Sequence, residues 1–127
     1  MKTILVDAVN TFVSPQGQIF QEMYNLLETF QEDKIILTNA DDSQIITFGL
    51  DKMPYPIFTL KHNPDKPDPQ YFQTFLEKYK LKADEVIYFE HNPDAVNSAQ
   101  SVGINTFHFN KDTRDLIALE KFLKANL

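Results

Sequence analysis

Short apolar runs alternate along the chain with segments in which apolar residues recur every three or four positions, and the alternation repeats five times. The apolar runs are the candidate β-strands: Thr3–Val6, Ile35–Thr38, Ile57–Leu60, Val86–Phe89 and Thr106–Phe109. Each run is mostly apolar and does not alternate with polar residues. We therefore expect strands that are buried on both faces, as in a parallel sheet covered by helices.

The intervening segments are typical of amphipathic helices. One predicted helical face consists of Ile19, Phe20, Met23, Tyr24, Leu27 and Phe30. A second consists of Tyr71, Phe72, Phe75, Leu76 and Tyr79, and Leu116, Ile117, Glu120 and Leu123 mark a last helix. Strands that alternate with helices predict an α/β fold with right-handed crossovers. We expect a three-layer α/β/α, Rossmann-like domain with a five-stranded parallel sheet, and a single domain over residues 1–127.

Local signals place the helix ends. Asp68-Pro69 and Asn92-Pro93 are each typical of an N-cap followed by proline at the first helical position, while Gly49 and Gly103 stand where helices should end. The three glycines of the chain are scattered singly, so the sequence contains no glycine-rich loop of the kind that cradles a nucleotide.

Composition narrows the function classes. The 127 residues include 18 acidic and 12 basic side chains, and the formal net charge of −6 provides no diffuse positive field for nucleic acid or an anionic membrane. The absence of cysteine excludes thiol catalysis, zinc ribbons and disulfide frameworks. The first apolar run ends at Asp7, too early for a signal peptide, and no stretch is long enough to span a membrane. We expect a cytoplasmic protein with neither a nucleic-acid nor a membrane partner; its oligomeric state stays open.

Polar side chains follow three of the predicted strands. Asp7, Thr38 and Glu90-His91 stand at strand ends, and Lys66 stands just before the third long helix. Because the carboxyl ends of parallel strands share one edge of a sheet, these groups should converge there. A carboxylate can attack a phosphoryl group when nearby cations offset the repulsion, and Lys66 or a bound metal would supply that charge.

Four segments carry a resemblance to a known family. They are Ile4-Leu5-Val6-Asp7-Ala8-Val9-Asn10-Thr11, Ile35-Ile36-Leu37-Thr38-Asn39, Lys66-Pro67-Asp68-Pro69-Gln70-Tyr71-Phe72 and Tyr88-Phe89-Glu90-His91-Asn92-Pro93. In order and spacing they resemble the four motifs of the haloacid dehalogenase superfamily of aspartate-nucleophile hydrolases, most of which are phosphatases. The third segment is the most specific match. The resemblance covers essentially the whole chain and implies the same α/β fold.

The resemblance assigns roles by position. It implies that Asp7 is the nucleophile, which forms an aspartyl phosphate, and that Thr38 and Lys66 bind the phosphate. It also implies a magnesium site formed by Asp7, the backbone carbonyl of Val9, Glu90 and the residue at position 91.

Two substitutions depart from the family pattern. Val9 replaces the aspartate that protonates the leaving group, and loss of such a general acid typically costs about 10²–10⁴-fold in rate. His91 stands where the resemblance implies the second metal-binding acid, and imidazole suits magnesium poorly because magnesium prefers oxygen ligands. We expect a weakened magnesium site, another divalent metal, or none.

The spacing of the motifs leaves no room for the cap domain of the family. One helix, or one helix and a strand, fills each interval between Asp7, Thr38 and Lys66, so the site should be open, with Thr11–Gln18 as its only flap. Some family members lack the second aspartate but rely on a cap and an arginine. Here the only arginine, Arg114, is expected to be exposed on the last helix, which disfavours dehalogenation.

Two functions therefore stay open. The first is a degenerate family member, which is either a very weak phosphatase or a pseudoenzyme, that is, a non-catalytic module that keeps the fold and binds or regulates. The second is an active capless phosphohydrolase with an atypical metal or none, acting on a phosphorylated small molecule or a phosphoprotein. The remaining histidines, His62 and His108, are expected to be structural or on the surface.

Overall fold

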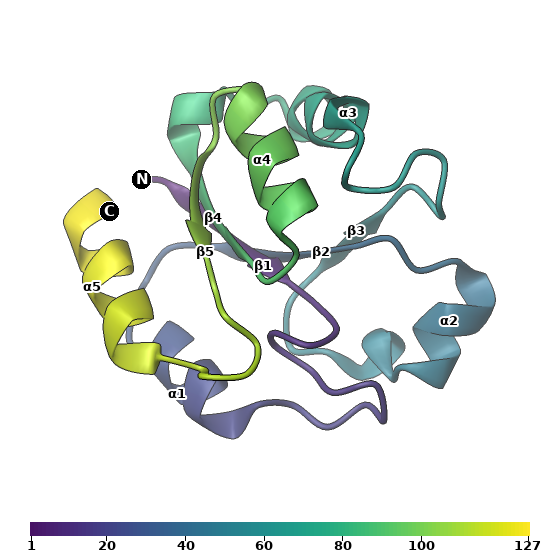
Figure 1. Ribbon diagram of the computed structural model, residues 1–127, viewed down its shortest axis with the longest axis horizontal. Helices are drawn as coiled ribbons and strands as arrows, with labels where there is room; N and C mark the ends of the chain where they lie inside the picture. The colour runs from purple at the N-terminus through teal and green to yellow at the C-terminus, as the bar shows by residue number, and fades with distance from the viewer.

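The computed structural model describes all residues 1–127 (Figure 1). The strands are β1 (Thr3–Asp7), β2 (Lys34–Thr38), β3 (Ile57–Thr59), β4 (Val86–Glu90) and β5 (Asn105–His108). The helices are α1 (Gln21–Leu27), α2 (Asp42–Thr47), α3 (Pro69–Tyr79), α4 (Pro93–Ser101) and α5 (Leu116–Asn126), with short 3₁₀ turns at Leu50–Lys52 and Ala83–Glu85. The predicted alternation of five strands with helices is confirmed.

The five strands form one parallel sheet in the order β3-β2-β1-β4-β5. Strand β1 lies at the centre, with Val6 opposite Ile36 of β2 and Phe89 of β4. This register brings the carboxyl ends of β1, β2 and β4 to one edge of the sheet, where Asp7, Thr38 and Glu90 end their strands. The predicted three-layer α/β/α fold is therefore confirmed, and no cap domain interrupts the sequence between these strands.

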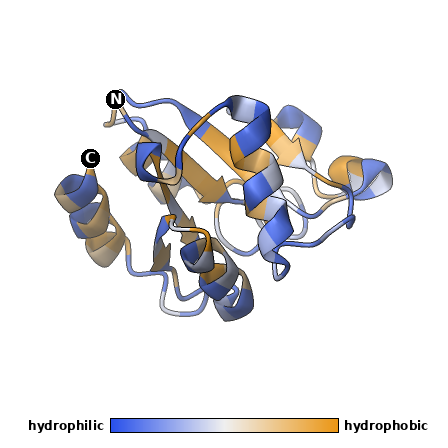
Figure 2. Cartoon of the chain, turned by 90° about the horizontal axis from the view of Figure 1, so that it is seen from above, coloured by the Kyte–Doolittle hydropathy of each residue, from blue (hydrophilic) through white to orange (hydrophobic).

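Helices α1 and α5 cover one face of the sheet, and α3 and α4 cover the other (Figure 1). The first core contains Met23, Leu27, Leu119 and Leu123 from the helices, and the second contains the aromatic stripe of α3. Figure 2 shows hydrophobic strands between helices whose outward faces are hydrophilic. Burial of these apolar side chains supplies the main driving force for folding. None of the helices has the length and hydropathy needed to cross a bilayer.

The aromatic stripe of α3 also fixes the strand ends near the site. Tyr71 and Phe75 pack edge-on against Phe58 of β3, with ring centroids 5.4 and 5.1 Å apart. The buried Tyr71 hydroxyl donates a hydrogen bond to the carbonyl of Thr38, at 2.7 Å. A helix on one face thereby holds the carboxyl end of β2 in place.

One expectation about burial was wrong, and one residue that marks the last helix lies outside its buried face. The edge strand β5 is not buried on both faces, because Asn105 and His108 are exposed and a neighbouring strand pairs with it on one side only. In α5 the side chain of Ile117 is 70% exposed, while Leu119 and Leu123 face the core. Residues four apart share a helical face, whereas Ile117 lies two positions from Leu119 and points away.

The predicted helix ends are confirmed. The side chains of Asp68 and Asn92 accept hydrogen bonds from the backbone N–H groups of Gln70 and Asp94 and so cap α3 and α4. Gly49 and Gly103 follow α2 and α4 with φ angles of 66° and 90°, a left-handed conformation that favours glycine. Together these signals set where the loops around the sheet edge begin.

Candidate active site

A buried lysine links two buried carboxylates at the edge of the sheet. The Lys66 ammonium group lies 2.6 Å from Asp7 Oδ1 and 3.0 Å from Glu90 Oε1, and each of the three side chains is at most 5% exposed. Charges are buried only when they are paired, so the three groups depend on one another. The predicted convergence of Asp7, Lys66 and Glu90 is confirmed in geometry.

The second oxygen of Asp7 is occupied as well. Thr11 donates its hydroxyl to Asp7 Oδ2 at 2.6 Å, and the backbone N–H of His91 donates to the same oxygen at 3.2 Å. His91 Nδ1 also contacts Asp7 Oδ2 and lies 3.3 Å from Glu90 Oε2. Asp7 is thus held from several sides, and His91 lies directly against the carboxylate proposed as nucleophile.

Glu90 is fixed by its own strand and by the start of α4. Tyr88, two residues earlier on the same face of β4, donates its hydroxyl to Glu90 Oε1 at 2.5 Å. The backbone N–H of Asn92 donates to Glu90 Oε2 at 3.0 Å. Both carboxylate oxygens are therefore satisfied by protein donors, as a buried carboxylate requires.

The surroundings shift the pKa values of these groups in opposite directions. Burial raises the pKa of Glu90 to about 7, and the nearby charge of Asp7 adds to this effect. Burial is the largest single influence on Asp7 and disfavours its ionisation, but the charge of Lys66 and the contacts with His91 and Glu90 together outweigh burial, so that the pKa of Asp7 lies well below its usual range. The hydrogen bond to Asp7 raises the pKa of His91. At neutral pH, Asp7 is consequently the ionised carboxylate of the pair.

A pocket of about 260 Å³ opens above Asp7 and Lys66, and Thr38 lies in its wall. Thr38 Oγ1 accepts a hydrogen bond from the backbone N–H of Ala40 at 3.2 Å, and its own hydroxyl hydrogen has no acceptor in the protein. The backbone N–H groups of Val9 and Asn39, which also line the pocket, have no acceptor in the protein either. Three donors without a protein acceptor thus belong to residues that line the same pocket.

The loop before α3 is fastened so that Lys66 points inward. Asn39 Oδ1 accepts the backbone N–H of Lys66 at 2.8 Å, and Ser98 of α4 donates its hydroxyl to the carbonyl of Pro67. Lys66 is therefore held from β2 on one side and from α4 on the other. Neither contact was predicted, because a single asparagine or serine in a sequence gives no sign of its partner.

The predicted flap, Thr11–Gln18, packs against the end of α2, and none of its residues lines the pocket. Gly17 lies against the end of α2, where an added Cβ would come within 3.2 Å of the carbonyl oxygen of Phe48. Val9 lines the pocket and forms a β-bridge with Val13 of the flap. Arg114 is exposed as expected, but it lies in the turn before α5, where its guanidinium group stacks on Phe20 at 4.5 Å.

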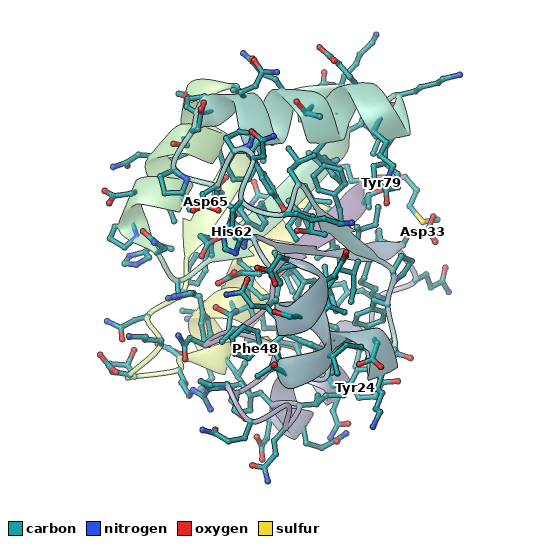
Figure 3. All side chains as sticks on the ribbon, turned by 90° about the vertical axis from the view of Figure 1, so that its right-hand side faces the viewer. Tyr24, Asp33, Phe48, His62, Asp65 and Tyr79 are labelled. Atoms are coloured by element: carbon teal, nitrogen blue, oxygen red, sulfur yellow. The ribbon has the colours of Figure 1, made fainter.

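The outer wall of the pocket comes from α2 and the loop after β3. Gln44, Phe48 and His62 line it, and Figure 3 shows His62 beside Asp65 at this side of the molecule. His62 Nδ1 lies 2.7 Å from Asp65 Oδ1, and Nε2 lies 2.5 Å from Gln44 Oε1. His62 was expected to be structural or on the surface, and it is exposed, but it also belongs to the wall of the pocket.

Asp7, Glu90 and His91 are the residues with the geometry to hold a metal, because each offers a ligand atom and these atoms lie within 4.8 Å of one another. The donor set nevertheless does not fit magnesium well. It contains two carboxylates that already accept hydrogen bonds from Lys66, Thr11 and Tyr88, and its third member is an imidazole. Such a set suits manganese or zinc better than magnesium.

Comparison with known proteins identifies the family. The family model described as haloacid dehalogenase-like hydrolase matches residues 2–109. The chain belongs to this family. The fold resembles that of a D,D-heptose 1.7-bisphosphate phosphatase from B. bronchiseptica complexed with magnesium and phosphate, with a TM-score of 0.73, 15% identity and all of both chains covered.

Other solved structures of the family share the fold. A haloacid dehalogenase-superfamily hydrolase of subfamily IA from Geobacter sulfurreducens has a TM-score of 0.69 at 11% identity, with 94% of this chain and 96% of that chain covered. An enzyme of the family from Bacteroides thetaiotaomicron, in complex with magnesium and inorganic phosphate, has a TM-score of 0.67 at 12% identity, with 85% and 93% covered. A search of the curated proteins found no match.

Sequence reasoning missed several residues of the site. Tyr88 fixes Glu90, Asn39 fixes Lys66, and Gln44 lines the outer wall. The position of Tyr88, two residues before Glu90 on one strand, is a signal that would have placed both side chains on one face. Asp94, an acid in the first turn of α4, is exposed and does not belong to the group formed by Asp7, Glu90 and His91.

Proposed function

We propose that this family member binds phosphate monoesters in the pocket at the edge of the sheet and hydrolyses them slowly or not at all. One observation carries the binding part of the proposal. The residues that line one pocket beside Asp7 carry the Lys66 ammonium group, the free hydroxyl hydrogen of Thr38 and the unpaired N–H groups of Val9 and Asn39. Several donors and a cation around a small cavity are the arrangement that a phosphate group requires.

The weak turnover follows from the groups around Asp7. Both of its oxygens accept hydrogen bonds, from Lys66 on one side and from Thr11 and His91 on the other. A carboxylate oxygen must give up at least part of this hydrogen bonding before it attacks a phosphoryl group. Val9 carries no group that can protonate the leaving oxygen or activate water, and this loss alone costs about 10²–10⁴-fold in rate.

The dependence of hydrolysis on magnesium should be weakened as well. Magnesium is expected to bind weakly, since His91 offers nitrogen where the family resemblance implies a carboxylate. A metal that accepts mixed nitrogen and oxygen ligands, such as manganese, would be the better occupant of Asp7, Glu90 and His91. When bound, such an ion would contribute positive charge beside the phosphate, which Lys66 already supplies in its absence.

Hydrolysis of phenyl phosphate tests this proposal, with magnesium, with manganese and with chelator. We expect turnover at least about tenfold below the median enzyme rate of about 10 s⁻¹ in every condition. Asp7→Asn is the matched control, because the amide keeps the size of the side chain and removes its nucleophilic character. Turnover near the median rate that Asp7→Asn abolishes would contradict the proposal and identify an active phosphohydrolase instead.

A further inference from the structure

One peptide group of the pocket wall is held from behind by a tyrosine of α3. The buried hydroxyl of Tyr71 lies 2.7 Å from the carbonyl oxygen of Thr38, the last residue of β2, and 3.2 Å from that of Phe58 in β3. Burial raises the pKa of Tyr71, so the hydroxyl keeps its proton. It therefore donates to these carbonyls, and the closer partner is the carbonyl of Thr38.

The other end of the same peptide group is the free N–H of Asn39. The peptide bond between Thr38 and Asn39 is trans, so the carbonyl and the N–H point in opposite directions within one plane. The carbonyl points to the β3 side of β2, as does the N–H of Ile36 two residues earlier, which donates to Pro56 at 2.8 Å. The Asn39 N–H consequently points to the opposite side, towards β1 and its last residue Asp7 (Figure 1).

The hydroxyl of Tyr71 is not needed for packing. The ring lies against those of Phe58 and Phe72, with centroids 5.4 and 5.2 Å apart, and a phenylalanine ring would make the same contacts. Phe72 and Phe75, on the same buried face of α3, are indeed phenylalanines. Burial of a hydroxyl costs free energy unless it is paired. What the hydroxyl adds at position 71 is therefore its hydrogen bond to the end of β2.

This hydrogen bond acts on the Asn39 N–H in two ways. It fixes the plane of the peptide group, so that an anion in the pocket meets an N–H that is already oriented. It also draws electron density from the carbonyl, which makes the N–H at the other end a stronger donor. Without the hydroxyl, the carbonyl of Thr38 loses this donor, and the peptide plane is free to turn towards the water in the pocket.

We propose that Tyr71 is a positioning residue for phosphate binding, whose hydroxyl aims the Asn39 N–H at a phosphate held beside Thr38 and Lys66. The proposal rests on the phosphate-binding function proposed above. Tyr71 is fully buried in the second core and does not line the pocket, so its effect reaches the ligand through the peptide group alone.

Titration of the ¹⁵N-labelled protein with inorganic phosphate, followed by NMR, tests the proposal. In the wild type we expect the amide proton signal of Asn39 to move to higher chemical shift as phosphate accepts its hydrogen bond. Tyr71→Phe should weaken the affinity for phosphate about threefold to tenfold, the factor that one hydrogen bond contributes, and should reduce the movement of the Asn39 signal at saturation.

The wild-type titration alone can refute the inference. Clear binding of phosphate with an unmoved Asn39 signal would overturn the role of Tyr71 and leave the proposed function standing, and this result does not depend on whether Tyr71→Phe folds. Failure of the wild type to bind phosphate would overturn both.

Two controls separate positioning from a general effect on the fold. Tyr79→Phe removes a hydroxyl from the same helix outside the pocket and should change neither the affinity nor the Asn39 signal. Ile104→Val weakens the same core from the opposite edge of the sheet, before β5, so stability should fall while both phosphate readouts stay unchanged. Wild-type affinity in Tyr71→Phe, or an equal fall in Ile104→Val, would refute the positioning role.

Discussion

Replacement of Lys66 by methionine should strongly destabilise the fold. The ammonium group lies 2.6 and 3.0 Å from Asp7 and Glu90, whose side chains are 3% and 1% exposed, so its loss leaves two buried carboxylates without their shared cation. Removal of one partner from a buried ion pair typically costs about 3–5 kcal/mol. This is a large share of the roughly 5–15 kcal/mol by which a domain of this kind is stable, so Lys66→Met should still fold, with a much lower free energy of unfolding.

The size of this loss should depend on pH and on Glu90. Burial and the charge of Asp7 already raise the pKa of Glu90 to about 7, and without Lys66 it should rise further. A raised carboxyl pKa disfavours the folded state at high pH, so the variant should lose more stability at pH ~8 than at pH ~6. At pH ~8, where Glu90 is more ionised, the double variant Lys66→Met with Glu90→Gln removes a buried charge that has lost its partner and should recover part of the loss.

Urea unfolding followed by circular dichroism measures these differences. Lys61→Met is the matched control, because Lys61 pairs with Asp42 at 2.9 Å on the surface, with the two side chains 55% and 81% exposed. Such pairs contribute about 0–1 kcal/mol. Two results would contradict this prediction. Lys66→Met would lower the free energy of unfolding no more than Lys61→Met does, or the addition of Glu90→Gln to Lys66→Met would recover none of the lost stability. Either result would mean that the two carboxylates and Lys66 are not the mutually dependent buried group described above.

Three further predictions concern the same region. The free energy of unfolding should fall as pH rises from about 5 to 8. The raised pKa values of Glu90 and His91 mean that the folded protein binds more protons than the unfolded chain over this range. A free energy of unfolding that instead increases with pH, measured by urea unfolding at several pH values, would contradict this prediction. Gly17→Ala should lower the stability of the fold by about 1–2 kcal/mol in thermal unfolding, because φ at this position is 84° and the new Cβ would lie 3.2 Å from the Phe48 carbonyl oxygen. An unchanged Tm would show that the flap is not held against Phe48. The double variant Val9→Asp with His91→Asp should raise magnesium-dependent hydrolysis of phenyl phosphate; a folded double variant without any gain would mean that the two substitutions do not account for the weak turnover.

Much of the fold was predictable because it depends on local signals. The apolar runs placed all five strands, and proline after Asp68 and Asn92 placed the starts of α3 and α4. The exposure of Ile117 and of β5 was not predicted. Whether an apolar residue faces the core depends on which neighbours cover it, and an edge position is a property of the strand order rather than of the strand itself.

The candidate site was predictable at its centre and not at its rim. The convergence of Asp7, Thr38 and Glu90 follows from strand ends that share an edge, and Lys66 joins them from the loop before α3. The contact of His91 with Asp7, by contrast, depends on a side-chain orientation that spacing does not determine. The hydrogen bond from the backbone N–H of Lys66 to Asn39 joins two segments that only folding brings together, so no sequence pattern predicts it.

Binding of inorganic phosphate to the pocket tests the central claim most directly. In a calorimetric titration the wild-type protein should bind one phosphate per chain, and Thr38→Val should weaken the affinity about threefold to tenfold by removing the free hydroxyl hydrogen. Thr74→Val, the same substitution on the outer side of α3, should leave the affinity unchanged. No detectable heat of binding by the wild type, or equal effects of the two substitutions, would contradict the phosphate-binding pocket.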